Sequence, residues 1–325
     1  MGESTAGDQG VVARLRAALR GAMVKFASLD SRRQGLILGL CATVIGALVA
    51  AVVVLFPHGD DGAETAVRPA AQAAAQSART YVALGSSYAS GPGGQYAMNS
   101  GRCGRSSNNY PHQVAAARGY RLVDVSCGGS VTGDILRSGK RPAQIDAVTP
   151  DTALVTITTG GNDIDYIGRI ISMGCLHATP EQARISGRNC GPNRHQAPEP
   201  GIDQYTRVGS DLVAVIQAVR ARAPQARILL VEYPPAIDPT APTCALLPLS
   251  PDQIAETGRI WNGLAQATVA AAQLTGVTLV AAPDAMAHTV CSPQPWINGF
   301  EPPVPFHPNA QGKRAMANMV LAAIG

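Results

Sequence analysis

Residues 81–92 read Tyr-Val-Ala-Leu-Gly-Ser-Ser-Tyr-Ala-Ser-Gly-Pro, an apolar run that passes into a glycine-containing loop. A short apolar run bounded by glycine and proline is typical of a buried strand that ends in a loop. Ser87 therefore lies at the carboxyl end of the predicted strand. A serine there is usually a turn or N-cap residue, but it is also where a nucleophile can be presented.

Downstream of this stretch, strand-like runs alternate with segments of helical periodicity. The strand-like runs are Tyr81–Gly85, Leu122–Cys127, Ala153–Thr159, Arg227–Tyr233 and Val277–Ala282. Segment 203–221 has apolar side chains on one helical face, and a capping box at Ser250 begins a helix that should reach about Leu274. This alternation predicts an α/β fold with right-handed βαβ units and a central parallel sheet of about five strands.

Three further residues follow predicted strands or precede the last helix. Gly129 comes after the second run and Asn162 after the third, whereas His307 lies in a loop directly before the amphipathic segment 310–324. Ligands of such sheets bind at the carboxyl ends of the strands, so these residues should lie near Ser87. The glycines could instead form simple turns, and His307 could cap the last helix. The other histidines, His58, His112, His177, His195 and His288, show no metal-ligand spacing and are predicted to be structural.

These four blocks, in this order, resemble the SGNH hydrolases, also called the GDSL esterase and lipase family. Residues 85–88 (Gly-Ser-Ser-Tyr) occupy the place of the family's Gly-Asp-Ser-Leu, and residues 160–163 (Gly-Gly-Asn-Asp) match its Gly-x-Asn-Asp. The resemblance covers the chain from about Tyr81 to the C-terminus. It implies a flavodoxin-like three-layer αβα fold for residues 80–325, without metal or cofactor.

The resemblance also implies a role for each residue. Ser87 would be the nucleophile and His307 the base of a carboxylic ester hydrolase, while the oxyanion would be held by Ser87, Gly129 and Asn162. Two positions depart from the family pattern: Ser86 replaces the usual aspartate, and Val304 stands where a carboxylate would orient the histidine. In some relatives with a similar departure, a backbone carbonyl three residues before the histidine takes this role, so the resemblance implies that the carbonyl of Val304 orients His307. Pro305 supports this expectation because it restrains the turn.

Of the seven cysteines, Cys41 lies in an apolar segment and the other six follow it. These six cysteines belong to the part of the chain that is predicted below to lie outside the cytoplasm, where disulfides persist. Their even number fits three disulfides, although six cysteines allow 15 pairings. Resemblance to secreted actinobacterial-type members of the family implies the sequential pairs Cys103–Cys127, Cys175–Cys190 and Cys244–Cys291.

The first part of the chain predicts a membrane anchor. Residues 35–56 are apolar and uncharged, long enough to cross about 30 Å of hydrocarbon as a helix. Basic residues dominate segment 1–34 and acidic residues follow the span, which predicts a cytoplasmic N-terminus, a tether at 57–79 and an extracytoplasmic catalytic domain at the cell membrane. A cleaved signal peptide is the alternative, but its apolar core is usually shorter and lies closer to the N-terminus.

The sequence narrows the function but not the substrate. The net charge is +4 and largely belongs to segment 1–34, so no electrostatic footprint for nucleic acid exists. A membrane-anchored, monomeric serine esterase or lipase is expected, and lipids or cell-envelope glycans are candidate substrates. The alternatives are an envelope polysaccharide O-deacetylase or acyltransferase, and a catalytically silent anchored binding protein, which the departures at Ser86 and Val304 would suit.

Overall fold

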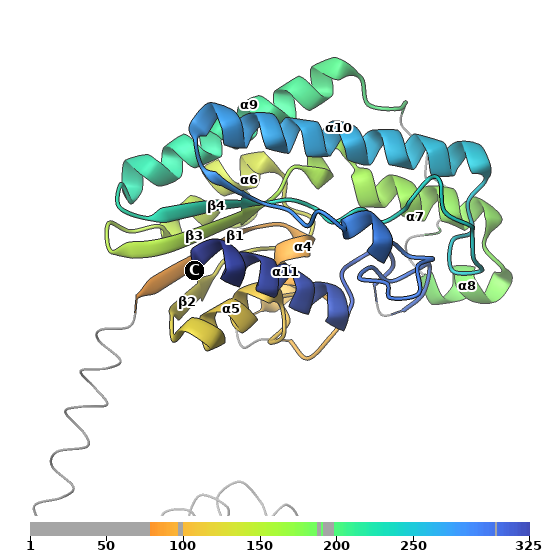
Figure 1. The fold of residues 1–325 in the computed structure, drawn as a ribbon, viewed down its shortest axis with the longest axis horizontal. Coiled ribbons are helices and arrows are strands. Elements are labelled where there is room, and N and C mark those ends of the chain that lie inside the picture. Colours follow the sequence, from red (N-terminus) through yellow and green to blue (C-terminus); the bar gives the residue numbers. More distant parts are fainter. Residues whose placement is uncertain (1–78, 97–99, 187–189, 191–197, 303) are drawn as a thin grey trace, which may run out of the picture. The chain divides into compact units, whose positions relative to one another are not determined.

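The computed structural model describes residues 79–96, 100–186, 190, 198–302 and 304–325 (Figure 1). Segment 1–34, the predicted transmembrane helix 35–56 and nearly all of the predicted tether 57–79 lie outside these ranges. Within the described ranges, no helix is both long and apolar enough to span a membrane. The first strand begins at Thr80.

The centre of the fold is a five-stranded sheet with the order β2-β1-β3-β4-β5. All four pairings are parallel, so the predicted parallel α/β sheet is confirmed. The strands are β1 (Thr80–Gly85), β2 (Arg121–Asp124), β3 (Thr152–Thr158), β4 (Arg227–Val231) and β5 (Thr278–Val280). β1 and β3 are central and nearly all buried, which explains their continuous apolar runs.

Helices cover both faces of the sheet (Figure 1). The helices α6 (Thr132–Leu136), α9 (Ile202–Arg222) and α10 (Pro251–Thr275) pack on one face, while α5 (Tyr110–Arg118) and α11 (Ala310–Ile324) pack on the other. α10 starts as predicted, because the Ser250 side chain accepts a hydrogen bond from the Gln253 N–H and Pro251 holds the first helical position. The fold is thus a three-layer αβα arrangement.

The connection after β3 contains two helices, α7 (Tyr166–His177) and α8 (Pro180–Ser186). The spacing of apolar residues explains the first of them, since Ile167, Ile170, Ile171 and Met173 lie on a buried face of α7.

The edge of the sheet at the carboxyl end of β1 is tightly packed. Gly85 has a φ of +142°, and a Cβ added there would lie 2.2 Å from the Thr158 carbonyl oxygen. The next residue, Ser86, donates its N–H to the same oxygen at 2.9 Å. A glycine is therefore required where β1 turns into the segment that carries Ser87.

Candidate active site

Ser87 is the first residue of a short helix, α4 (Ser87–Ser90), directly after β1. The Ser90 N–H donates to the Ser86 carbonyl at 2.9 Å, and Gly91 ends the turn in the left-handed region with a φ of 58°. Ser87 itself is only 8% exposed. The strand and turn together hold the Ser87 hydroxyl at the edge of the sheet.

The loop after β2 packs beside Ser87. The Cys127 N–H donates to the Gly85 carbonyl at 2.9 Å, and a Cβ added at Gly128 would lie 4.0 Å from the Ser87 Cβ. Gly129, the predicted donor, follows with a φ of +79° and is exposed. The structure therefore brings the Gly128–Gly129 turn next to Ser87.

Asn162 lies in the turn η3 (Gly161–Ile164) after β3. Its Nδ2 donates to the Ser130 carbonyl at 2.8 Å, which joins the third block to the loop that carries Gly129. The adjacent Asp163 carboxylate accepts bonds from the Thr132 N–H at 3.1 Å and the Thr132 hydroxyl at 2.6 Å. Burial raises the Asp163 pKa, whereas these hydrogen bonds lower it. Asp163 thus anchors the start of α6 beside the site.

His307 is 8% exposed, and its Nδ1 lies 2.8 Å from the Pro305 carbonyl oxygen. Because a carbonyl only accepts hydrogen bonds, Nδ1 carries the proton and the other ring nitrogen, Nε2, is left as the base. Burial is the main cause that lowers the His307 pKa to about 4; the bond to Pro305 acts in the opposite direction, and the charge of Lys313 acts in the same direction as burial. The imidazole is therefore neutral at physiological pH.

The prediction that Val304 orients His307 is wrong in this structure. The carbonyl oxygen of Val304 instead lies 3.3 Å from the Asn298 Nδ2, which donates to it. Phe306 has a φ of 56°, so the chain turns through the left-handed region just before the histidine. This turn brings the carbonyl two residues before His307, that of Pro305, to the ring.

Tyr88 contributes to the site although the sequence pattern did not single it out. Its hydroxyl donates to the Phe306 carbonyl at 2.9 Å, and its ring centroid lies 5.7 Å from that of His307. Tyr88 directly follows Ser87, so one residue ties the serine segment to the histidine loop. The only signal in the sequence is that adjacency.

The ring of Tyr88 stacks on the ring of Tyr233, and the two ring centroids lie 4.3 Å apart. The Tyr233 hydroxyl makes a hydrogen bond with the Ser86 hydroxyl. Ser86, which stands where the family has aspartate, therefore contacts Tyr233, whose ring stacks on that of Tyr88. Burial raises the pKa of Tyr233, so its hydroxyl keeps its proton at neutral pH.

The three disulfides are those that the family resemblance implied. Cys103 is bonded to Cys127, Cys175 to Cys190 and Cys244 to Cys291. The first bridge lies next to the site, where the Gly128 N–H also donates to the Cys103 carbonyl at 2.9 Å. This bridge restrains the loop that carries the predicted oxyanion donor.

Comparison with known proteins shows the family of the chain. The model of the GDSL-like lipase/acylhydrolase family matches residues 83–315. The chain is 36% identical over 281 residues to Lipase 2 of Streptomyces coelicolor, which covers 81% of this chain and 92% of that protein. The chain therefore belongs to the GDSL-like lipase/acylhydrolase family, and it is a carboxylic ester hydrolase.

Two solved structures share its fold. The extracellular lipase of Streptomyces rimosus superposes with a TM-score of 0.61 at 29% identity, covering 76% of this chain and all of that one. Phospholipase A1 of Streptomyces albidoflavus superposes with a TM-score of 0.59 at 26% identity, covering 76% of this chain and 99% of that one.

Proposed function

We propose that the chain hydrolyses carboxylic esters through an acyl-enzyme, with Ser87 as nucleophile and His307 as general base. The observation that carries this proposal is the His307 Nδ1 bond to the Pro305 carbonyl, in a loop tied by Tyr88 to the serine segment. This arrangement leaves Nε2 free to accept a proton. A backbone carbonyl thus takes the orienting place of the missing carboxylate.

In the first half-reaction, the Ser87 oxygen attacks the ester carbonyl while His307 accepts the hydroxyl proton. The carbon–oxygen bond to the alcohol then breaks, and His307 returns the proton to the departing alcohol. In the second half-reaction, water attacks the acyl group, His307 takes its proton, and the acid leaves as Ser87 regains a proton. No metal or cofactor has a part in this sequence.

The negative charge that develops on the carbonyl oxygen requires donors. We assign this role to the Ser87 and Gly129 N–H groups and to the Asn162 amide. Support comes from the position of the Gly128–Gly129 turn beside Ser87 and from the bond that joins Asn162 to that loop. A shift of Asn162 Nδ2 from the Ser130 carbonyl to the oxyanion would supply the third donor.

We further propose that the enzyme acts on fatty acyl esters outside the cytoplasm while anchored through residues 35–56. The names of its relatives as lipases support the acyl substrate, and the apolar segment with its basic flank supports the anchor. The hydrolase domain acts as a monomer. N-terminal analysis of the mature protein tests the anchor, because cleavage between Phe56 and Thr80 would contradict it.

A fluorophosphonate probe tests the chemistry. It should label the full-length chain at Ser87, and peptide mapping should find no label in Ser87→Ala. A catalytically silent protein would be folded and unlabelled. Profiling hydrolysis against acyl chains from two carbons upward then separates a lipase, which prefers long chains, from an esterase or a glycan O-deacetylase, which prefers short ones.

A further inference from the structure

A large cavity adjoins the loop that carries Gly129. Its volume is about 880 Å³, within the range of about 300–1,000 Å³ that small-molecule sites occupy. Cys127 and Ser130, on the two sides of the Gly128–Gly129 turn, line it, and so does Gln144, whose Oε1 accepts from the Gly85 N–H at 2.7 Å. The cavity therefore lies beside the turn that carries Gly129, and its lining contacts the end of β1 through Gln144.

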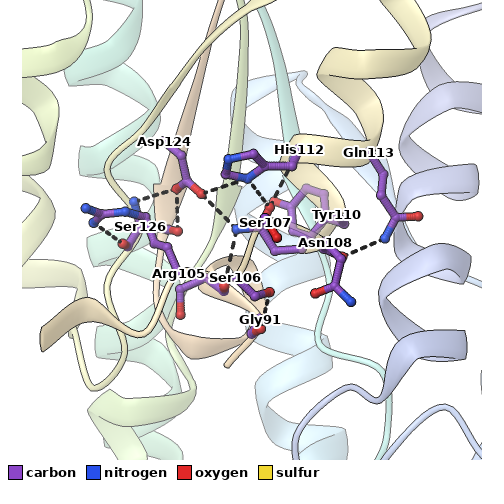
Figure 2. A network of polar contacts seen from close by, with 12 residues as sticks. Gly91, Arg105, Ser106, Ser107, Asn108, Tyr110, His112, Gln113, Asp124 and Ser126 are labelled. Carbon is purple, nitrogen blue, oxygen red and sulfur yellow. Dashed lines mark hydrogen bonds and ion pairs between the residues drawn. The ribbon is translucent and has the colours of Figure 1, made fainter. Parts of the chain in front are cut away.

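Four basic side chains line this cavity: Arg102, Arg105, Lys140 and Arg141. The structure gives Arg105 a bond to the Ser126 carbonyl at 3.0 Å, drawn in Figure 2. The Arg141 Nη1 lies 2.6 Å from the Cys127 sulfur and 3.5 Å from the Ser130 hydroxyl, both of which are uncharged. Arg141 thus brings a positive charge against the loop of the predicted oxyanion donor.

Two acidic residues of the cavity offset the charges of Arg102, Lys140 and Arg141 only in part. Asp134 carries a negative charge and accepts from the Val131 N–H at 3.1 Å, at the start of α6, whereas Asp146 is paired with Arg222 at 3.0 Å. Arg222 does not line the cavity. Among the described residues, no acidic side chain forms an ion pair with Arg102, Lys140 or Arg141. These three basic side chains outnumber Asp134, so the lining carries a net positive charge.

We infer that this cavity is a subsite for a phosphate group on the alcohol side of the ester substrate. Guanidinium groups bind phosphate through paired, charge-assisted hydrogen bonds, and a lysine adds a point charge. A phosphate held there would place the neighbouring ester beside Ser87 and Gly129. This inference rests on the proposed ester hydrolysis and specifies its substrate as a phosphate-bearing acyl ester.

Two substrates with the same acyl chain and the same ester linkage isolate the phosphate: 1-oleoylglycerol and 1-oleoylglycerol 3-phosphate. Full-length protein in uncharged detergent micelles, at fixed ionic strength, should release oleate from the phosphate ester with the higher kcat/KM. The double variant Lys140→Gln/Arg141→Gln should lower the ratio of the two kcat/KM values about tenfold or more, the effect of losing hydrogen bonds to a charged group.

The exposed Arg207, on α9, supplies a matched control, because Arg207→Gln removes one charge away from the cavity. That variant should leave the ratio unchanged. Inorganic phosphate should inhibit hydrolysis of the phosphate ester by the wild type more strongly than by the double variant.

Equal kcat/KM for the two esters in a wild type that fluorophosphonate labels at Ser87 would overturn the subsite and leave the hydrolase function standing. The same conclusion holds if inorganic phosphate binds without any preference for the phosphate ester, because the cavity then holds only a free anion. If neither ester is cleaved and Ser87 is not labelled, the proposed function and the subsite both fail.

Discussion

Two clusters of serine and histidine lie at the carboxyl ends of neighbouring strands, and only one is suited to catalysis. After β1, the segment that carries Ser87 is tied by Tyr88 to the loop of His307, and residues 304–309 of that loop include no carboxylate. After β2, Ser126 and His112 surround a carboxylate, that of Asp124 (Figure 2). By residue types alone, the second cluster is the more complete triad.

The hydrogen bonds decide otherwise. The Ser126 hydroxyl donates directly to the Asp124 carboxylate at 2.6 Å, so it is not aligned with an imidazole. The His112 Nδ1 lies 2.8 Å from the Asn109 Oδ1 and 3.7 Å from the nearest Asp124 oxygen. A triad needs the histidine between serine and acid, and here the acid lies between the other two.

The second cluster instead stabilises the segment of the first through hydrogen bonds. Asn109 donates through Nδ2 to Asp124 at 2.8 Å and to the Ser90 carbonyl at 3.2 Å, and so links β2 to the end of α4. Burial raises the pKa of Asp124, against the hydrogen bonds from Ser126 and Asn109, which lower it. The order of contacts, more than the presence of a carboxylate, therefore defines a catalytic histidine.

The greatest loss of kcat should come from substitutions in the first cluster, and the same substitution in the second cluster should have little effect. Ser87→Ala or His307→Ala should lower kcat by about 10⁴-fold or more, because each removes a reacting group. Ser126→Ala, the matched change in the second cluster, should retain most activity. Steady-state hydrolysis of a soluble ester by the folded variants measures both. A Ser126→Ala enzyme as inactive as Ser87→Ala would reverse the assignment.

The next largest loss of activity is expected at Asn162, the proposed side-chain donor to the oxyanion. Asn162→Ala should lower kcat about 10²- to 10³-fold with little change in KM, because the amide acts mainly on the transition state. Asn109→Ala removes an amide from the second cluster and should chiefly lower the melting temperature. Unchanged turnover in Asn162→Ala would exclude this amide from the oxyanion site.

The link between the serine and histidine segments should have an intermediate effect. Tyr88→Phe removes one hydrogen bond, worth about 0.5–1.5 kcal/mol, and keeps the ring, so kcat should fall several-fold while KM changes little. Because His307 would lose its alignment, the pH dependence of kcat/KM should change as well. In Tyr233→Phe the Phe306 bond remains, which makes it the control. Identical loss in both variants would point to general destabilisation of the tyrosine pair.

The burial of His307 should also be visible in the pH dependence of kcat/KM. The neutral imidazole is the active form, and burial lowers the His307 pKa to about 4, so kcat/KM should be half-maximal near pH 4 and level from about pH 5 upward. Activity regained after return to pH 7 controls for unfolding. A half-maximal point at pH 6.5 or higher would mean that His307 is solvated or paired with a negative charge.

The smallest effect is expected at Val304. Val304→Ala removes only side-chain methyl groups and keeps the backbone carbonyl that accepts from Asn298, so it should retain nearly full kcat and the same pH profile. Pro305→Ala keeps the orienting carbonyl and loses only the restraint on φ, so its kcat should fall modestly. If Val304→Ala were far less active than Pro305→Ala, the Val304 side chain would hold the His307 loop more than the restrained turn at Pro305 does.

Local sequence pattern alone predicts the parallel sheet and the position of Ser87 at its edge. Strand runs such as Tyr81–Gly85 are buried on both faces, and that burial appears directly as a local apolar pattern. The capping box at Ser250 located the start of α10 for the same reason, because all of its hydrogen bonds are local. The three disulfides followed from resemblance to the family, since 15 pairings were open from the cysteines alone.

Long-range packing selects the carbonyl that contacts His307 and the cluster that can be catalytic. The choice of Pro305 over Val304 depends on the left-handed backbone of Phe306, whose carbonyl is bound by Tyr88, a residue 218 positions away in the chain. The Asp124 cluster likewise depends on how β2, α5 and α4 pack. Backbone direction within a turn, and the order of contacts among polar groups, are set by long-range packing that no local pattern encodes.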